Sequence, residues 1–337
     1  MKFKLLSATL LALGLTTTVS QAETIRYAHF MPAQSWQQST MFEAWADAVD
    51  EASGGELDVK IFPAQTLGKA PAGYDNAKNG VADIAWTVQG YTAGRFPLSQ
   101  IMELPGLFKR AEVGSCAFQK LYDSGALDEE YKDTHVLFVH THGPGQLHMG
   151  DKPVKALSDL KGMKLRRPTA VIGTLLGELG AEPVGLPAPA IYENLERGVI
   201  DGYMLTWESV EAFRLAELTK YHTDFGFYSL AFVTTMNKRK YEALSEKEKA
   251  AIDANSGMKW SLIAGKGYDE ADATAIKSLE ASSEIFEIPE AEMTEWQAAA
   301  DRAKAIYLSE LDGKGLPGTK TYETIKGYVS DCQAELN

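Results

Sequence analysis

Hydrophobic and polar residues alternate along residues 24–29 and again along residues 57–62. This period of two predicts two strands. Between them, residues 39–52 carry apolar side chains at helical spacing, among them Phe42 and Val49, and a Ser-Gly-Gly run ends the predicted helix. Strand, helix and strand form a βαβ unit. The pattern therefore predicts a parallel sheet covered by helices, which binds ligands at the carboxyl ends of its strands.

A second series of the same kind follows later in the chain. Residues 182–186 and 199–204 have the composition of strands, and residues 190–197 between them are helical in pattern. This repetition predicts a second domain built like the first. The aromatic and β-branched residues 225–236 predict either a strand pair or one long strand that crosses between the domains.

A long helix is predicted over residues 245–282, which contain no proline and carry recurrent apolar residues. Ser245 and Glu248 form a capping-box pattern at its start. At 1.5 Å per residue such a helix exceeds the width of one domain, so we expect it to span both. Gly265 and Gly267 are candidate points for a bend. Two further helices are predicted at residues 293–311 and 322–336.

The first residues have the pattern of a secretory signal peptide. Lys2 and Lys4 form a basic start, residues 5–15 form a short apolar run, and Ser20 and Ala22 are small residues before the expected cleavage after Ala22. The rest of the chain has no apolar run of about 18 residues, the length that crosses a membrane. We therefore expect an exported protein without a membrane-spanning helix.

The net charge of the chain disfavours some kinds of binding partner. Without the signal peptide the chain has 31 basic and 46 acidic residues, a net charge near −15 with neutral histidines. This balance disfavours nucleic acid and anionic membrane surfaces as partners. An anionic ligand has to be attracted by a local positive charge, which a buried arginine would supply.

Cys116 and Cys332 are the two cysteines of the chain. Export to an oxidising compartment favours a disulfide between them over two free thiols. The disulfide would close a very long loop, although measured stabilisation does not follow loop length closely.

The candidate ligand anchor is a pair of adjacent arginines, Arg166 and Arg167, which end a predicted strand in the segment D-L-K-G-M-K-L-R-R-P. Neighbouring side chains of a strand point to opposite faces, so only one of the two can face a cleft. A guanidinium stays charged at any working pH and holds a carboxylate through two parallel hydrogen bonds, which suits a small organic acid. Spacing alone, however, favours an ordinary pair of surface arginines.

Two predicted loops at the carboxyl ends of strands are aromatic, residues 29–36 and residues 86–95. Trp36, Trp86 and Tyr91 are candidates to wall an apolar ligand pocket, while large aromatic side chains more often fill the core.

Three histidines raise the question of a zinc site. His140 and His142 share one face of a predicted strand, and His148 follows a Gly-Pro-Gly turn. Asp151 is the one further candidate ligand nearby, so we expect packing or ligand hydrogen bonding and no metal. The sequence also lacks G-x-S-x-G, H-E-x-x-H and phosphate-loop motifs, which disfavours a periplasmic enzyme.

Several segments together point to one family. They are the export signal, D-L-K-G-M-K-L-R-R-P, the strand L-G-A-E-P-V, the segment I-Y-E-N-L-E-R-G-V-I-D-G and the long helix. In these segments the chain resembles the periplasmic solute-binding proteins of TRAP transporters, the DctP type, over essentially its whole mature length. The resemblance implies a two-lobed α/β fold of the Venus-flytrap kind, with two mixed or parallel sheets and a long helix spanning both lobes.

The resemblance also implies how the chain is divided and used. Residues 1–22 would be the signal peptide, residues 23–143 with about 233–272 would form lobe I, and residues 144–232 with about 273–337 would form lobe II. The lobes would close on an organic acid by hinge motion in the periplasm. They would deliver it to a permease with small and large integral membrane subunits. A monomer without a cofactor is expected.

By this resemblance, Arg166 is the arginine that forms a salt bridge with the ligand carboxylate. Residues 145–148 lack the second basic residue of many relatives, and Leu205 stands where relatives often have Asn. The loss of these polar groups favours a monocarboxylate with an apolar or aromatic body, because an unpaired buried carboxylate is costly. The candidate ligand-binding residues are Arg166, Trp207, Phe30, Trp36, Trp86, Tyr91, Gln146, His148, Tyr203, Leu205 and Phe227.

Alternatives to this interpretation stay open. A C4-dicarboxylate or a sugar acid is the alternative ligand within the same family. A chemosensory binding protein that feeds a receptor shares every pocket feature, and a periplasmic enzyme is the remaining alternative class.

Overall fold

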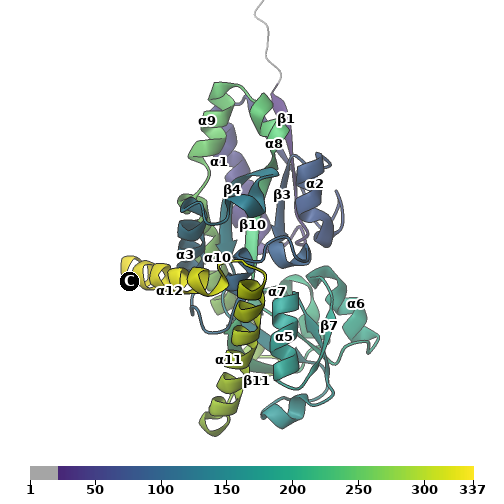
Figure 1. Ribbon diagram of the computed structural model, residues 1–337. Helices are drawn as coiled ribbons and strands as arrows, with labels where there is room; N and C mark the ends of the chain where they lie inside the picture. Colours follow the sequence, from purple (N-terminus) through teal and green to yellow (C-terminus); the bar gives the residue numbers. More distant parts are fainter. Residues whose placement is uncertain (1–21) are drawn as a thin grey trace, which may run out of the picture.

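The computed structural model describes residues 22–337, and the predicted signal peptide therefore lies outside the described residues except for Ala22. Figure 1 shows two lobes, one above the other, each built around its own sheet. This mixed α/β, two-lobed architecture confirms the predicted fold class. Within residues 22–337 no helix is both long and apolar enough to span a membrane.

Lobe I contains a five-stranded sheet in the order β2-β1-β3-β10-β4. β1 pairs in parallel with β2 and β3, and β10 runs antiparallel to β3 and β4. The strands are β1 (Glu23–Ala28), β2 (Leu57–Phe62), β3 (Ile84–Val88), β4 (Thr134–Thr141) and β10 (Ala231–Asn237). The helices are α1 (Ala44–Ser53), α2 (Gly73–Asn79), α3 (Ala111–Asp123), α4 (Asp128–Tyr131), α8 (Lys238–Ala243) and α9 (Glu246–Ala254). The first predicted βαβ unit is confirmed, with a π-helical segment η1 (Gln37–Glu43) leading into α1.

Lobe II contains a six-stranded sheet in the order β11-β9-β5-β8-β6-β7. β6 runs parallel to β7 and β8, and β5 is antiparallel to β8 and β9. The strands are β5 (Gly145–Met149), β6 (Lys164–Arg167), β7 (Glu182–Gly185), β8 (Gly202–Leu205), β9 (Tyr221–Tyr228) and β11 (Glu284–Glu287). The helices are α5 (Ala170–Glu178), α6 (Ile191–Glu196) and α7 (Trp207–Ala212).

The chain crosses between the two sheets at three places. One crossing joins β4 to β5, and a second joins β9 to β10 through Ser229 and Leu230. The aromatic segment is thus a strand pair with one strand in each sheet. The third crossing is α10 (Met258–Glu280), which packs against α3 in lobe I and α7 in lobe II. The lobe boundaries given by the sequence stay a prediction.

The prediction of one helix over residues 245–282 is wrong in one respect, because two helices, α9 and α10, occupy this segment. Gly257 separates them with φ of 69°, a left-handed conformation that favours glycine, and its N–H donates to the Leu137 carbonyl at 2.7 Å. The capping box of Ser245 and Glu248 at the start of α9 is confirmed.

Gly265 and Gly267, the candidate points for a bend, lie within the continuous helix α10 and allow close packing. A Cβ atom at Gly265 would lie 2.6 Å from the Cα of Glu112 in α3, and one at Gly267 would lie 2.3 Å from the Trp36 ring. These glycines bring the backbone of α10 directly against lobe I.

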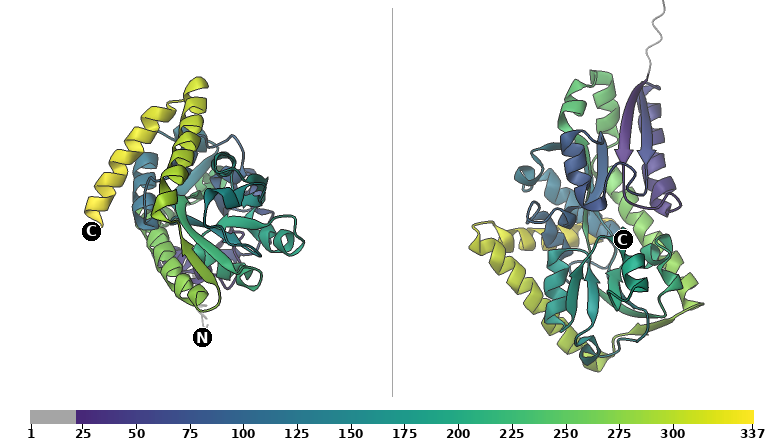
Figure 2. Two further views of the ribbon diagram at one scale, coloured as in Figure 1. Left: turned by 90° about the horizontal axis from the view of Figure 1, so that it is seen from below. Right: turned by 90° about the vertical axis from the view of Figure 1, so that its right-hand side faces the viewer.

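The chain ends in α11 (Glu290–Gly313) and α12 (Gly318–Glu335), as predicted, and Figure 2 shows both helices at the edge of the molecule. α11 packs against α5 and α12 packs against α3. The predicted disulfide between Cys116 of α3 and Cys332 of α12 is present. It fastens the terminal helix to lobe I.

We expect the double variant Cys116→Ser, Cys332→Ser to lower the free energy of unfolding by roughly 2–5 kcal/mol, because the disulfide closes a loop of more than two hundred residues. Urea unfolding of both proteins measures the difference. Intact mass after alkylation without reductant provides the control, since two alkylated thiols in the native protein would contradict the disulfide.

A buried acid lies where the two lobes meet. Glu103 ends the 3₁₀ segment η4 (Ser99–Glu103) in lobe I, and its Oε2 accepts a hydrogen bond of 2.6 Å from the hydroxyl of Thr169, at the start of α5 in lobe II. Gly90 makes this approach possible, since a Cβ there would lie 2.3 Å from the Thr169 methyl carbon. Burial raises the pKa of Glu103 to about 8, against the hydrogen bonds from Thr169 and Gln100.

This raised pKa predicts that the contribution of Glu103 to stability is lost as the pH rises from about 5 to about 8. In that window the folded protein holds a proton on Glu103 that the unfolded chain has released, so Glu103 lowers the free energy of unfolding by about 1.4 kcal/mol per pH unit. Buried neutral histidines have the opposite effect below about pH 6.5, so the Glu103 slope is measured between about pH 7 and 8. Urea unfolding at several pH values measures this slope. Glu103→Gln should flatten it, although not completely, because burial also raises the pKa of Glu130 to about 7. An unchanged slope would contradict the assignment.

Candidate ligand-binding site

A small cavity lies at the junction of the lobes. Five of the predicted ligand-binding residues line it. They are Phe30, Trp86, Tyr91, Arg166 and Leu205. Eleven further residues complete the lining: Met31, Val88, His142, Ala188, Thr206, Glu208, Ser209, Phe213, Leu230, Phe232 and Tyr268. The walls therefore come from the strand ends of both sheets, from α7 and from α10.

Arg166 is the cationic group of this cavity, and its side chain is 0 % exposed. Its position follows from β6, which ends at Arg167 and pairs with β7 and β8. Three N–H groups of the guanidinium are bonded: Nε donates to the Leu186 carbonyl at 2.8 Å, Nη1 to the Met204 carbonyl at 2.6 Å and Nη2 to the Tyr91 hydroxyl at 3.2 Å. A guanidinium has five N–H donors, so one remains on each Nη nitrogen.

No carboxylate neutralises this charge within residues 22–337, since none of the ion pairs there involves Arg166. Its neighbour Arg167 is only half-buried and packs against Gly173 and Gly185. The two arginines thus differ as strand alternation predicts, with Arg166 directed into the cavity.

Aromatic rings form most of the apolar wall. Trp86 stacks on Phe232 with ring centroids 4.9 Å apart and contacts Phe30 at 4.7 Å. The stacking follows from the antiparallel pairing of β3 with β10. The indole Nε1 of Trp86 donates to His140 Nε2 at 2.8 Å, which fixes the plane of the ring.

The histidines near the cavity are neutral. Burial lowers the pKa of His140 to about 3, and burial together with the charge of Arg166 lowers the pKa of His142 to about 4. His148 also has a pKa well below its usual value because of burial and its neighbour His222. Arg166 is therefore the cation that lines the cavity at neutral pH.

Glu208 is a buried acid in the wall of the cavity. It accepts hydrogen bonds from Trp36 Nε1 and Gln37 Nε2, both at 3.2 Å, and from the hydroxyls of Thr206 and Ser209. Burial raises its pKa, against these four donors. Its bonds to Trp36 and Gln37 connect α7 of lobe II to η1 of lobe I.

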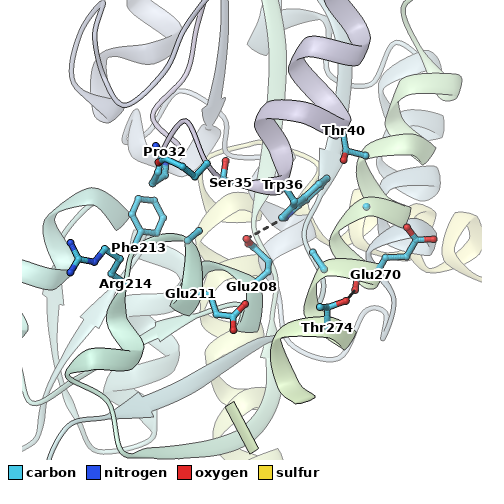
Figure 3. Close-up of a pocket in the computed structure, with 14 residues that line it drawn as sticks. Pro32, Ser35, Trp36, Thr40, Glu208, Glu211, Phe213, Arg214, Glu270 and Thr274 are labelled. Atoms are coloured by element: carbon cyan, nitrogen blue, oxygen red, sulfur yellow. Dashed lines mark hydrogen bonds between the residues drawn. The ribbon is translucent and has the colours of Figure 1, made fainter. Parts of the chain in front are cut away.

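A second, more open hollow lies outside the cavity, and Figure 3 shows the side chains that line it. Glu208 and Phe213 line both hollows and so form the wall between them, whereas Arg166 lines only the inner cavity. The outer hollow carries Glu208, Glu211 and Glu270 against Arg214. This excess of carboxylates disfavours an anion, so the inner cavity is the candidate site for an organic acid.

Six predicted site residues do not line the inner cavity. Trp36 lines the outer hollow. His148 and Tyr203 are paired neighbours on β5 and β8, two residues below the strand ends, and are bonded within lobe II to His222 and Thr219. Trp207 packs against His148. Gln146 accepts from the Gly226 N–H and donates to the Pro144 carbonyl, and Phe227 packs against the core.

The sequence interpretation missed several residues of the wall, notably Phe213, Phe232 and Tyr268. Phe232 lies in the aromatic segment that was expected to cross between the lobes, and that crossing was the available signal. Phe213 follows α7 and Tyr268 lies in α10, where apolar periodicity alone does not distinguish a cavity wall from core.

Comparisons with known proteins identify the family of this chain. A family model described as bacterial extracellular solute-binding protein, family 7 (DctP), matches residues 27–309. Among curated relatives, the 2,3-diketo-L-gulonate-binding periplasmic protein of Escherichia coli is 26% identical over 75% of this chain and 78% of its own length.

Solved structures agree with the family model. A TRAP solute-binding protein from Rhodoferax ferrireducens with copurified benzoate is 38% identical, with a TM-score of 0.90 over 94% of this chain and 100% of its own. A marine metagenome TRAP solute-binding protein in complex with 3-hydroxybenzoate is 37% identical, with a TM-score of 0.88 over 93% and 99%. This chain belongs to the DctP family of bacterial extracellular solute-binding proteins, the solute-binding proteins of TRAP transporters.

Proposed function

We propose that this protein captures an aromatic monocarboxylate in the periplasm and delivers it to the integral membrane permease subunits of a TRAP transporter. The observation that carries the proposal is the buried Arg166 guanidinium, which faces an aromatic cavity with one N–H left on each Nη nitrogen. Burying an unpaired charge costs several kcal/mol. A ligand carboxylate would accept both N–H groups and neutralise the charge.

The remaining walls favour a monocarboxylate with a ring. Phe30, Trp86 and Phe232 offer flat apolar surfaces, and aromatic contacts contribute roughly 0.5–1.5 kcal/mol beyond their buried area. Leu205 supplies no hydrogen bond from its side chain. A second carboxylate on the ligand would meet the neutral His142 and Glu208, which disfavours a C4-dicarboxylate.

The relatives support this ligand class without limiting the family to it. Two neighbours of 37% and 38% identity hold 3-hydroxybenzoate and benzoate, whereas the relative from Escherichia coli binds a sugar acid. The family and these neighbours are solute-binding proteins, so we propose that the chain binds its ligand without transforming it. A chemosensory role would use the same site.

We expect Arg166→Lys to weaken the binding of benzoate by roughly 2–5 kcal/mol, because a lysine ammonium cannot reproduce the two parallel hydrogen bonds and leaves the Leu186 and Met204 carbonyls without donors. Calorimetric titration measures the loss. Arg167→Lys is the matched control on the same strand and should bind nearly as well as the wild type. Equal losses in the two variants would mean that the wrong arginine was chosen.

We further expect benzoate and 3-hydroxybenzoate to bind more tightly than succinate, malate or sialic acid. A thermal-shift screen detects this order, because a ligand at 100 times its dissociation constant adds about 2.7 kcal/mol of stability. Competition titrations then rank the hits. Tightest binding of a dicarboxylate or a sugar acid would contradict the ligand class and require a second polar contact, with Gln89, Gln146 and His148 the first candidates.

A further inference from the structure

The hydroxyl of Tyr91 joins the two lobes at the cavity. Tyr91 ends the 3₁₀ segment η3 (Gln89–Tyr91), which directly follows β3 of lobe I. Its oxygen accepts a hydrogen bond of 3.2 Å from Arg166 Nη2 and one of 3.0 Å from the N–H of Ala188. Both donors belong to lobe II, Arg166 to β6 and Ala188 to the 3₁₀ segment η6 (Ala188–Ala190).

One hydrogen-bonding group of this hydroxyl, its hydrogen atom, is not used within residues 22–337. A phenol oxygen has two lone pairs and one hydrogen. The two N–H groups of lobe II occupy the lone pairs, and the hydrogen of Tyr91 has no acceptor among residues 22–337. Tyr91 and Arg166 line the same cavity. The unused O–H therefore lies beside the two unused N–H groups of the guanidinium.

We propose that Tyr91 is a carboxylate-binding residue that couples ligand binding to closure of the lobes. The ligand carboxylate accepts two N–H groups from Arg166 in lobe II and the O–H group from Tyr91 in lobe I. This arrangement rests on the proposed function, and it gives the carboxylate contacts on both sides of the cleft. We call the group formed by Tyr91, Arg166 and Ala188 the carboxylate clasp.

Electrostatics explains why the clasp requires an anion. Closing the lobes removes Arg166 from water, which is unfavourable for a charge without a partner. The Tyr91 lone pair that accepts from Arg166 compensates only part of that loss, since a neutral hydroxyl is a weaker partner than a carboxylate. An aromatic molecule without a carboxylate, such as benzyl alcohol, fills the apolar wall but leaves the charge unpaired. The carboxylate, not the ring, thus drives closure.

The two parts of Tyr91 have different tasks. Its ring contacts Phe30 with centroids 5.8 Å apart and belongs to the apolar wall that the sequence predicts. Its hydroxyl belongs to the clasp. Tyr91→Phe removes the hydroxyl and keeps the ring, so this variant separates packing from carboxylate recognition.

The first experiment is titration of wild type and Tyr91→Phe with benzoate. We expect the variant to bind about 10- to 100-fold more weakly, because a hydrogen bond to a charged group is lost. Small-angle scattering without ligand and with saturating benzoate provides the second readout. The wild type should contract with benzoate but not with benzyl alcohol, and Tyr91→Phe should contract less than the wild type even at saturation.

Tyr74→Phe is the matched control. Tyr74 also lies in lobe I, accepts a hydrogen bond from Thr134 at 3.1 Å and contacts another aromatic ring, Phe96, but it lies outside the cavity. We expect wild-type affinity and wild-type contraction from this control.

Ala188→Pro is the second test of the clasp, since it removes the other N–H that donates to Tyr91. Pro187 already has the extended backbone that a residue before proline adopts. The Ala188→Pro variant should weaken benzoate binding in the same direction as Tyr91→Phe.

The outcomes are distinct. Wild-type affinity in Tyr91→Phe would overturn the clasp and leave the proposed function intact, provided that Arg166→Lys still loses binding. Weaker binding with full contraction would also overturn it and reduce Tyr91 to an ordinary contact. If the wild type bound none of the aromatic acids, the clasp and the proposed function would fall together.

Discussion

A guanidinium that is shielded from water where two lobes meet is the constraint on which the rest of this structure depends. Arg166 can be buried because β6, β7 and β8 end side by side, so that the carbonyls of Leu186 and Met204 receive two of its N–H groups. These carbonyls orient the side chain but do not neutralise its charge. Lobe I supplies the Tyr91 hydroxyl and the aromatic wall, and in the proposed function the ligand would supply the missing negative charge.

The fold brings the lobes close enough for this by means of glycines at the contacts. Gly90, next to Tyr91, leaves room for Thr169 at the first turn of α5, and Gly267 leaves room for the Trp36 ring against α10. Each contact links one lobe to the other or to the helix that spans both. Side chains at these points would hold the lobes apart, and the hydrogen bonds of Glu103, Tyr91 and Glu208 across the cleft could not form together.

The sequence predicts much of the fold because βαβ units, caps and glycine stops are local signals. The rule about strand ends points to Phe30 and Tyr91, which follow β1 and β3, and to Trp86 within β3, and all three line the cavity. The family resemblance, and not this rule, points to Arg166 and Leu205. Tyr203 and His148 do not line the cavity and are bonded within lobe II to Thr219 and His222. Phe213 and Tyr268 could not be found, because their place in the wall depends on how α7 and α10 pack after the chain has crossed between lobes. The break at Gly257 depends likewise on a tertiary hydrogen bond to Leu137.

An acidic protein that binds an anion must obtain its affinity at short range. The net charge of −13, and the carboxylates of the outer hollow, oppose an approaching organic acid. Attraction becomes dominant only inside the cavity, where water is excluded and the Arg166 charge is weakly screened. Those conditions exist only while the lobes are in contact. In the proposed mechanism, separation of the lobes would return water to Arg166 and break the Tyr91 contact to lobe II, and the surrounding negative charge would then favour departure of the ligand. The same distribution of charge therefore supports tight binding in the closed form and release in the open form, which is what a carrier that delivers its ligand to a membrane partner requires.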